Sequence, residues 1–132
     1  MKWFAPTGVI LLFMSVSYAR GQAAGDLCRE GTSPQQMACA EREFRAASDQ
    51  LKRARAELYE DLEPRSRVKF RAAERLWLKY RKSNCGAEAS IYEGGTIQPL
   101  VELLCTARVT RERAAELKAQ TQTLSGTDEN ED

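Results

Sequence analysis

The chain has 132 residues, with 20 basic and 19 acidic side chains, and its formal net charge is +1 at pH 7. This length gives one domain with one modest core and leaves no room for a second domain. There is no histidine, no Gly-x-Ser-x-Gly motif and no phosphate-binding glycine loop, which excludes the common classes of enzyme. We therefore expect a protein without catalytic activity, cofactor or metal.

The first residues are typical of a secretory signal peptide. Lys2 precedes an apolar run at residues 9–14, and Ser17 and Ala19 are small residues at the −3 and −1 positions of a cleavage site. The run is shorter than the ~20 residues that a membrane-spanning helix needs. Leu27 stands before the first cysteine, where a lipoprotein has Gly or Ala. We expect cleavage after Ala19, with the Ala23–Ala24 bond as the alternative, and a periplasmic or secreted product without a membrane anchor.

The first predicted helix carries apolar residues at alternating steps of three and four. Ser33 and Pro34 supply a cap and a first-turn residue, and Pro64 ends the helix near residue 62. The steps place one apolar stripe on one helix face. The stripe consists of Met37, Ala40, Phe44, Ala47, Leu51, Ala54 and Leu58.

Two further helices show the same alternation. The second is expected to end at Gly94-Gly95, and the third runs until the composition turns polar at Thr121. The stripe of the second is Phe70, Ala73, Trp77, Tyr80, Asn84, Ala87 and Ile91, and that of the third is Leu100, Leu103, Ala107, Thr110, Ala114 and Leu117. These patterns predict an all-α fold, a small antiparallel three-helix bundle.

Four cysteines are expected to form two disulfides. They lack the Cys-x-x-Cys spacing and the histidines of a zinc site, and an exported protein meets an oxidising compartment. We favour the pairing that closes two local loops, Cys28–Cys39 and Cys85–Cys105. The main alternative is Cys39–Cys85 with Cys28–Cys105. The expected organisation is a signal peptide over residues 1–19, a helical domain over 28–124 and a disordered acidic tail over 125–132.

The middle of the chain is basic. Between Arg65 and Lys82 there are eight basic residues and the single acid Glu74. Four of these bases are spaced by four and line one helix face, namely Arg67, Arg71, Arg75 and Lys79. A solvated face is the simplest interpretation, and an anionic envelope polymer is the alternative partner. No aromatic residue is interleaved for base stacking, so nucleic acid is not expected.

The cysteines and their neighbours carry a resemblance to a known family. Its most specific element is Trp77-x-x-Tyr80-Arg81-x-x-x-Cys85, followed by Gly94-Gly95 and Cys105. The other matching residues are Cys28, Thr32, Gln36, Cys39, Pro99, Thr110, Arg113 and Leu117. In these positions the chain resembles the lysozyme inhibitor LprI family over about residues 28–117. The resemblance implies a small exported bacterial protein that inhibits lysozyme.

The chain departs from the family in two places. It keeps the family's aspartate, leucine and tyrosine as Asp49, Leu51 and Tyr59, but it lacks the asparagine that commonly follows the leucine. The glutamine usual three residues before the tryptophan is replaced by Glu74. Both positions are expected on a helix surface or near a turn, so the resemblance stands.

Each motif residue has a structural and a functional interpretation. Trp77 and Tyr80 lie on the apolar stripe, which favours core packing over ligand recognition. Arg81 and Arg113 are expected to form ion pairs that hold the helices in register, with anion binding as the alternative. The acids proposed as their partners are Glu57, Glu60, Asp61 and Glu63.

The candidate binding segment is the turn between the second and third helices. Tyr92, Glu93, Gly94, Gly95 and Thr96 form a flexible loop that we expect to enter a lysozyme cleft, although the glycines also serve as a helix end. Because many lysozymes are cationic, contact is expected away from the basic face. The predicted function is a lysozyme inhibitor-like protein that binds a cell-wall hydrolase. The alternative is a structural or scaffolding envelope protein that binds other proteins or anionic polymers through its basic helix face.

Overall fold

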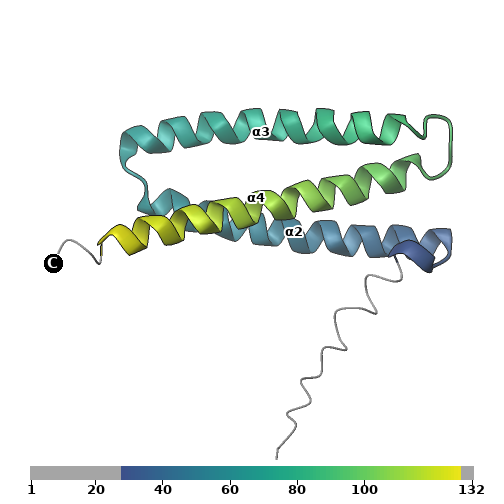
Figure 1. Cartoon of the computed structure of the whole chain (residues 1–132), viewed down its shortest axis with the longest axis horizontal. Helices are drawn as coiled ribbons and strands as arrows, with labels where there is room; N and C mark the ends of the chain where they lie inside the picture. The colour runs from purple at the N-terminus through teal and green to yellow at the C-terminus, as the bar shows by residue number, and fades with distance from the viewer. Residues whose placement is uncertain (1–27, 129–132) are drawn as a thin grey trace, which may run out of the picture.

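The computed structural model describes residues 28–128, and this part of the chain is helical apart from its turns. A helical turn at residues 28–30 leads into three long helices, α2 (Ser33–Asp61), α3 (Pro64–Ser90) and α4 (Gln98–Asp128). Figure 1 shows that α3 runs opposite to α2 and α4. None of the helices in this range is long and apolar enough to cross a membrane. The predicted signal peptide, both cleavage sites and residues 129–132 lie outside the described residues.

The start of α2 and the junction between α2 and α3 follow from local sequence. Thr32, rather than the predicted Ser33, is the N-cap, and its backbone N–H donates to Gln35 Oε1 at 2.9 Å. α2 ends at Asp61, and Pro64 is the first residue of α3, where its missing N–H costs no helical hydrogen bond. The predicted break at Pro64 is therefore confirmed.

The other helix ends differ from the prediction. α3 stops at Ser90, before the twin glycine, and Gly94 takes a φ of +77° inside the following turn. A left-handed φ costs glycine no Cβ clash, so Gly94 shapes the turn instead of ending the helix. α4 continues to Asp128, so residues 125–128 of the predicted tail are helical.

The main core lies between α2 and α4, as their stripes predict. Five of the buried residues in this seam are alanines, which let the two helix backbones approach closely: Ala40, Ala47, Ala54, Ala107 and Ala114. Leu51, Leu58 and Leu117 fill the remaining space and form one cluster with Ala54 and Ala114. Phe70 and Trp77 of α3 pack against the edge of this cluster.

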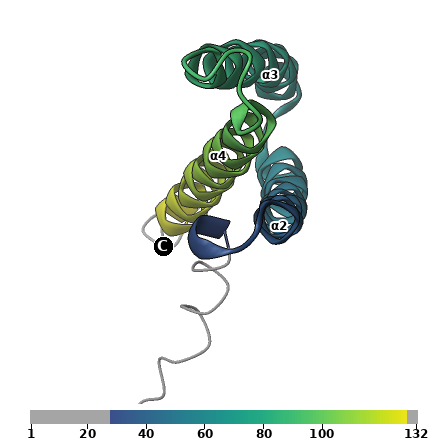
Figure 2. The same ribbon diagram turned by 90° about the vertical axis from the view of Figure 1, so that its right-hand side faces the viewer.

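The stripe predicted for α3 is wrong in part. Four residues of this stripe were expected in the core but are exposed, namely Ala73, Tyr80, Ala87 and Ile91. Glu74, Cys85 and Ala89 are buried instead. The Cys85–Cys105 bond and the ion pairs of Glu74 turn this inner face toward α4. α3 meets α2 mainly through long arginine and aromatic side chains, for example Arg55 with Glu74. Figure 2 shows α4 between the other two helices, so the bundle is uneven, with α3 at its edge.

Two disulfides join residues that are close in sequence. Cys28 is bonded to Cys39, and Cys85 to Cys105, at separations of 11 and 20 residues. The structure thus has the two local loops and not the long-range alternative. The start of α2 and the α3–α4 turn lie at the same end of the molecule, so both bonds reinforce that end (Figure 1).

Candidate binding surfaces

A cluster of charges connects the three helices around Glu74. One carboxylate oxygen of Glu74 accepts hydrogen bonds from Arg113 Nε (2.9 Å) and Nη2 (2.7 Å), and the other pairs with Arg55 of α2. The exposed fractions of these side chains are 11% for Glu74, 16% for Arg113 and 31% for Arg55. Arg113 also pairs with Glu116 at 2.9 Å. The ion pair expected for Arg113 is therefore present, but its partners are Glu74 and Glu116 and not the acids at residues 57–63.

Arg81 makes a different set of contacts. Its Nη1 donates to Thr110 Oγ1 at 2.8 Å, and its guanidinium carbon lies 5.1 Å from the Trp77 ring centroid and 5.9 Å from that of Phe44. No carboxylate within residues 28–128 pairs with it, so the predicted ion pair of Arg81 is absent. Cation–π contacts and one hydrogen bond hold this cation in place of a counter-charge.

The two motif arginines have opposite pKa shifts. Burial lowers the pKa of Arg81, and the nearby charge of Arg55 lowers it further. Burial also acts to lower the pKa of Arg113, but hydrogen bonds and charge attraction from Glu116 and Glu74 outweigh it and raise this pKa. Both groups stay protonated at neutral pH, so they act as fixed charges and not as proton donors.

The motif residues divide between the interior and the surface. Trp77, Arg81 and Arg113 hold α3 against its neighbours, whereas Tyr80 is exposed. The sequence analysis named Glu74 as the single acid of the basic stretch and as a departure from the family, but it expected this residue at a helix surface or near a turn, whereas it is buried. It named Thr110 without its hydrogen bond to Arg81, and it missed Arg55. The sequence did contain a signal for Glu74. It is the single acid in a basic stretch, so its carboxylate attracts cations and is a natural partner for an ion pair. Nothing in the sequence pattern distinguished Arg55 from the other bases of α2.

The predicted basic face is divided in the structure. Arg67 and Arg71 lie over the ring of Tyr59, at 5.0 and 5.6 Å, and Arg67 Nη2 donates to the carbonyl oxygen of Glu60. Arg75 and Lys79 are exposed and pair with no carboxylate in the described part of the chain. Arg67 and Arg71 therefore hold the junction between α2 and α3, whereas Arg75 and Lys79 face solvent.

The hairpin tip, residues 91–97, joins α3 to α4 and is exposed throughout. Its apolar side chains are Ile91 (77% exposed), Tyr92 (45%) and Ile97 (47%). The carbonyl oxygen of Tyr92 accepts a hydrogen bond from the Gly95 N–H at 2.9 Å, which closes the turn. Every residue of the predicted binding loop thus lies at one solvent-facing end of the molecule.

The charge around the hairpin tip is acidic. Residues 83–107 contain no base and three acids, Glu88, Glu93 and Glu102. Glu88 is neutralised by Arg108 at 2.9 Å, while Glu93 and Glu102 are exposed and make no ion pair within residues 28–128. The tip therefore offers apolar contact next to negative charge.

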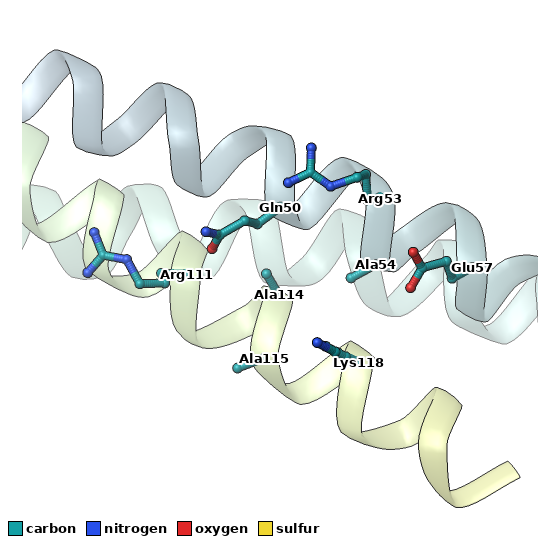
Figure 3. Close-up of a pocket in the computed structure, with 8 residues that line it drawn as sticks. All are labelled: Gln50, Arg53, Ala54, Glu57, Arg111, Ala114, Ala115 and Lys118. Carbon is teal, nitrogen blue, oxygen red and sulfur yellow. The ribbon is translucent and has the colours of Figure 1, made fainter. Parts of the chain in front are cut away.

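A groove of about 410 Å³ lies between α2 and α4. Ala54 and Ala114 leave the space, and Gln50 and Lys118 extend into it from opposite helices (Figure 3). The other lining residues are Arg53, Glu57, Arg111 and Ala115. The charged side chains of the groove are one carboxylate, Glu57, and three cations, Arg53, Arg111 and Lys118. Residues 28–128 contain no group of three or more potential ligands that would hold a metal ion.

Long helices, two local disulfides and a buried charge cluster define a small disulfide-stabilised all-helical protein. The sequence profile of the family described as Lysozyme inhibitor LprI matches residues 28–117, and the chain belongs to this family. The matched range is the one that the sequence resemblance predicts, and it contains both disulfides, the Glu74 cluster and the hairpin tip.

The chain is also similar to one bacterial protein over most of its length. It is 26% identical to an uncharacterized protein of Rhizobium meliloti (strain 1021), and the match covers 89% of this chain and 94% of that protein. No solved structure gives a significant match to the chain.

Proposed function

We propose that this protein is a lysozyme inhibitor-like protein that binds a cell-wall hydrolase through its hairpin tip. The observation that carries the proposal is the exposure of Ile91, Tyr92 and Ile97 at the end of the molecule, beside the free carboxylate of Glu93. Family membership supports inhibition as the function. An inhibitor of this kind needs no catalytic residue, because it only has to occupy the cleft that holds the two carboxylates of a lysozyme.

The tip suits insertion because a disulfide and a hydrogen bond restrict its shape before binding, in contrast to the flexible loop expected from the sequence. The Cys85–Cys105 disulfide joins the two helices below it, and Gly94 and the Tyr92–Gly95 hydrogen bond define the turn. A loop held in its bound shape loses less conformational entropy on association, which raises affinity. Its acidic surroundings also favour encounter with a cationic lysozyme.

We also infer that the protein works outside the cytoplasm, in the periplasm or as a secreted product. The signal-like residues 1–19 and the two disulfides support this location, because disulfides persist in oxidising compartments. Lysozymes reach their substrate in the same compartments.

The experiment is a titration of purified, oxidised protein against a panel of lysozymes, with clearance of peptidoglycan as the readout. We expect inhibition at stoichiometric concentration and a loss of more than tenfold for Tyr92→Ala and Ile97→Ser together, as is typical when central interface side chains are removed. Leu124→Ser, an exposed apolar position at the far end of α4, is the matched control. Circular dichroism establishes that all variants keep their helix content.

Two outcomes would reject the proposal. One is the absence of inhibition for every lysozyme in the panel. The other is inhibition that survives the double substitution unchanged, which would move the contact away from the hairpin tip. A sample reduced at both disulfides reports whether the shape of the tip, and not its composition alone, is required.

The alternative of a scaffold that binds through the basic helix face receives less support. Arg67 and Arg71 are engaged with Tyr59, so the face predicted from the four-residue spacing is shorter than expected. This favours the hairpin tip as the main site for a protein partner.

A further inference from the structure

α3 carries a second apolar line on the side that faces away from α4. Val68, Leu76 and Tyr80 are 63%, 66% and 56% exposed, although each is large enough to contribute to a core. At 3.6 residues per turn their spacing of eight and four keeps them within about a third of the helix circumference. Single exposed apolar residues are ordinary, but a line of them along one helix marks a contact surface.

Cations are interleaved with this apolar line. The same side of α3 presents Arg65, Lys69, Arg75, Lys79 and Lys82, all of them exposed. None of the five forms an ion pair with the described residues, in contrast to Arg108, Arg111 and Arg113. We call Val68, Leu76, Tyr80 and these five cations the outer face of α3.

No carboxylate opposes these charges on the outer face. Glu74 is the only acid of α3 before Glu88, and it is buried on the opposite side, where Arg55 and Arg113 neutralise it. The inward turn of Glu74 thus has two effects. It holds the helices together, and it leaves the outer face uniformly positive.

The position of α3 makes this face accessible to an extended surface. α4 lies between α3 and α2, and nothing in residues 28–128 covers the far side of α3 (Figure 2). At 1.5 Å per residue the helix is about 40 Å long. Figure 1 shows it running along one long edge of the molecule, so the helix can lie flat on a plane.

We propose that the outer face of α3 binds the surface of membranes that contain anionic lipids. The five cations contact lipid phosphates, while Leu76, Tyr80 and Val68 enter the headgroup region beside them. Long lysine and arginine side chains reach the phosphates from a helix that lies in the interface plane, because their aliphatic stems cover apolar surface. The helix rests on the membrane and does not cross it.

The positive charge of the outer face of α3 favours an anionic partner. Its apolar line favours a bilayer over a soluble polyanion. A phosphate polymer in water gains nothing from contact with leucine or valine, whereas a lipid interface accepts both groups. The proposal is independent of lysozyme inhibition, since it concerns a different surface from the hairpin tip. A protein with both properties would concentrate its inhibitory tip near the membrane.

The test is co-sedimentation of the oxidised protein with vesicles of phosphatidylglycerol and phosphatidylcholine, compared with phosphatidylcholine alone. We expect binding only to the anionic vesicles, and weaker binding at high salt. Each basic residue near an anionic surface changes affinity by about fivefold, so Lys69→Gln, Arg75→Gln and Lys79→Gln together should reduce it roughly a hundredfold. The control of equal charge change is Arg42→Gln, Lys52→Gln and Lys118→Gln on α2 and α4, which should bind like the parent.

A second variant tests the contribution of the apolar residues and distinguishes a lipid bilayer from a soluble polyanion. Leu76→Ser with Tyr80→Ser should weaken vesicle binding by at least tenfold without changing net charge. Both positions are exposed, so the variant keeps the fold, as circular dichroism verifies.

Three results would overturn the proposal. They are equal binding to both kinds of vesicle, equal losses in the two triple variants, and unchanged vesicle binding when Leu76 and Tyr80 are replaced. The last result, combined with competition by soluble polyphosphate, would assign the outer face of α3 to a polyanion in solution instead.

Discussion

At the scale of single residues, Glu74 is the side chain whose ion pairs connect all three long helices. Its carboxylate accepts hydrogen bonds from Arg113 and pairs with Arg55, so one side chain of α3 connects α2 and α4. Removing one partner from a buried ion pair leaves the others without a counter-charge, which costs more than the pair itself contributes. A glutamine at this position would still accept a hydrogen bond from Arg113 but would bring no charge.

We predict that Glu74→Leu lowers the free energy of unfolding by about 2 to 3 kcal/mol. The loss falls at the low end for a buried pair because water reaches part of Arg55. Glu74→Gln should lose less, since an amide oxygen still accepts from Arg113. Glu116→Leu, which removes the exposed partner of the same arginine, should cost less than about 1 kcal/mol. Urea unfolding of the oxidised proteins measures all three, and equal losses for Glu74→Leu and Glu116→Leu would contradict the assigned role of Glu74.

At the scale of helices, the apolar spacing predicts two of the three faces. α2 and α4 meet through Ala, Leu and Thr110, so the residues at steps of three and four are also the buried ones. α3 differs because its inner face includes Glu74, Arg81 and Cys85, while its outer face includes Leu76 and Tyr80. A spacing count treats every apolar residue as inward and every charge as outward, so it placed Tyr80 inside and missed Glu74.

The candidate surfaces were predictable to different degrees, because a local sequence pattern marks the hairpin tip whereas contacts between distant residues form the Glu74 cluster. The hairpin tip follows from Gly94 and Gly95, because glycine pairs mark a turn whatever surrounds it. The Glu74 cluster depends on contacts of Arg55 and Arg113 from helices distant in sequence, and no local pattern encodes those. The local disulfide pairing was the favoured one of three possible pairings, and only the arrangement of the helices decides among them.

The seam between α2 and α4 gives a prediction at this scale. Ala47 is 1% exposed, so Ala47→Leu forces the two closely packed helices apart and should lower stability by about 1 to 3 kcal/mol. The neighbouring Ala46 is exposed, and because leucine and alanine have similar helix propensities, Ala46→Leu should change stability by less than about 0.5 kcal/mol. Thermal unfolding followed by circular dichroism distinguishes the two. A tolerated Ala47→Leu would show that the seam has room and that its alanines are not required for close approach.

At the scale of the whole molecule, the near-neutral net charge conceals two separated regions of opposite sign. The outer face of α3 is positive over residues 65–82, whereas residues 83–107 at the hairpin tip contain acids and no base. Both proposals depend on this separation, since a cationic protein and an anionic surface would then contact different places on the molecule. It also means that a charge change should affect lysozyme binding according to its position and not only according to the net charge.

Glu93→Lys tests this dependence on position. Reversing the charge at the hairpin tip should slow association with a cationic lysozyme by about tenfold at low salt, because steering depends on the local potential. The effect should shrink at high salt, where exposed charges are screened beyond about 10 Å. Glu60→Lys makes the same change in net charge on an exposed residue at the opposite end of α2 and should slow association much less. Association rates measured by surface plasmon resonance at two salt concentrations show whether the two variants differ as expected. If both variants slow association equally, the lysozyme senses only the total charge, and the acidic surroundings of the tip do not steer it.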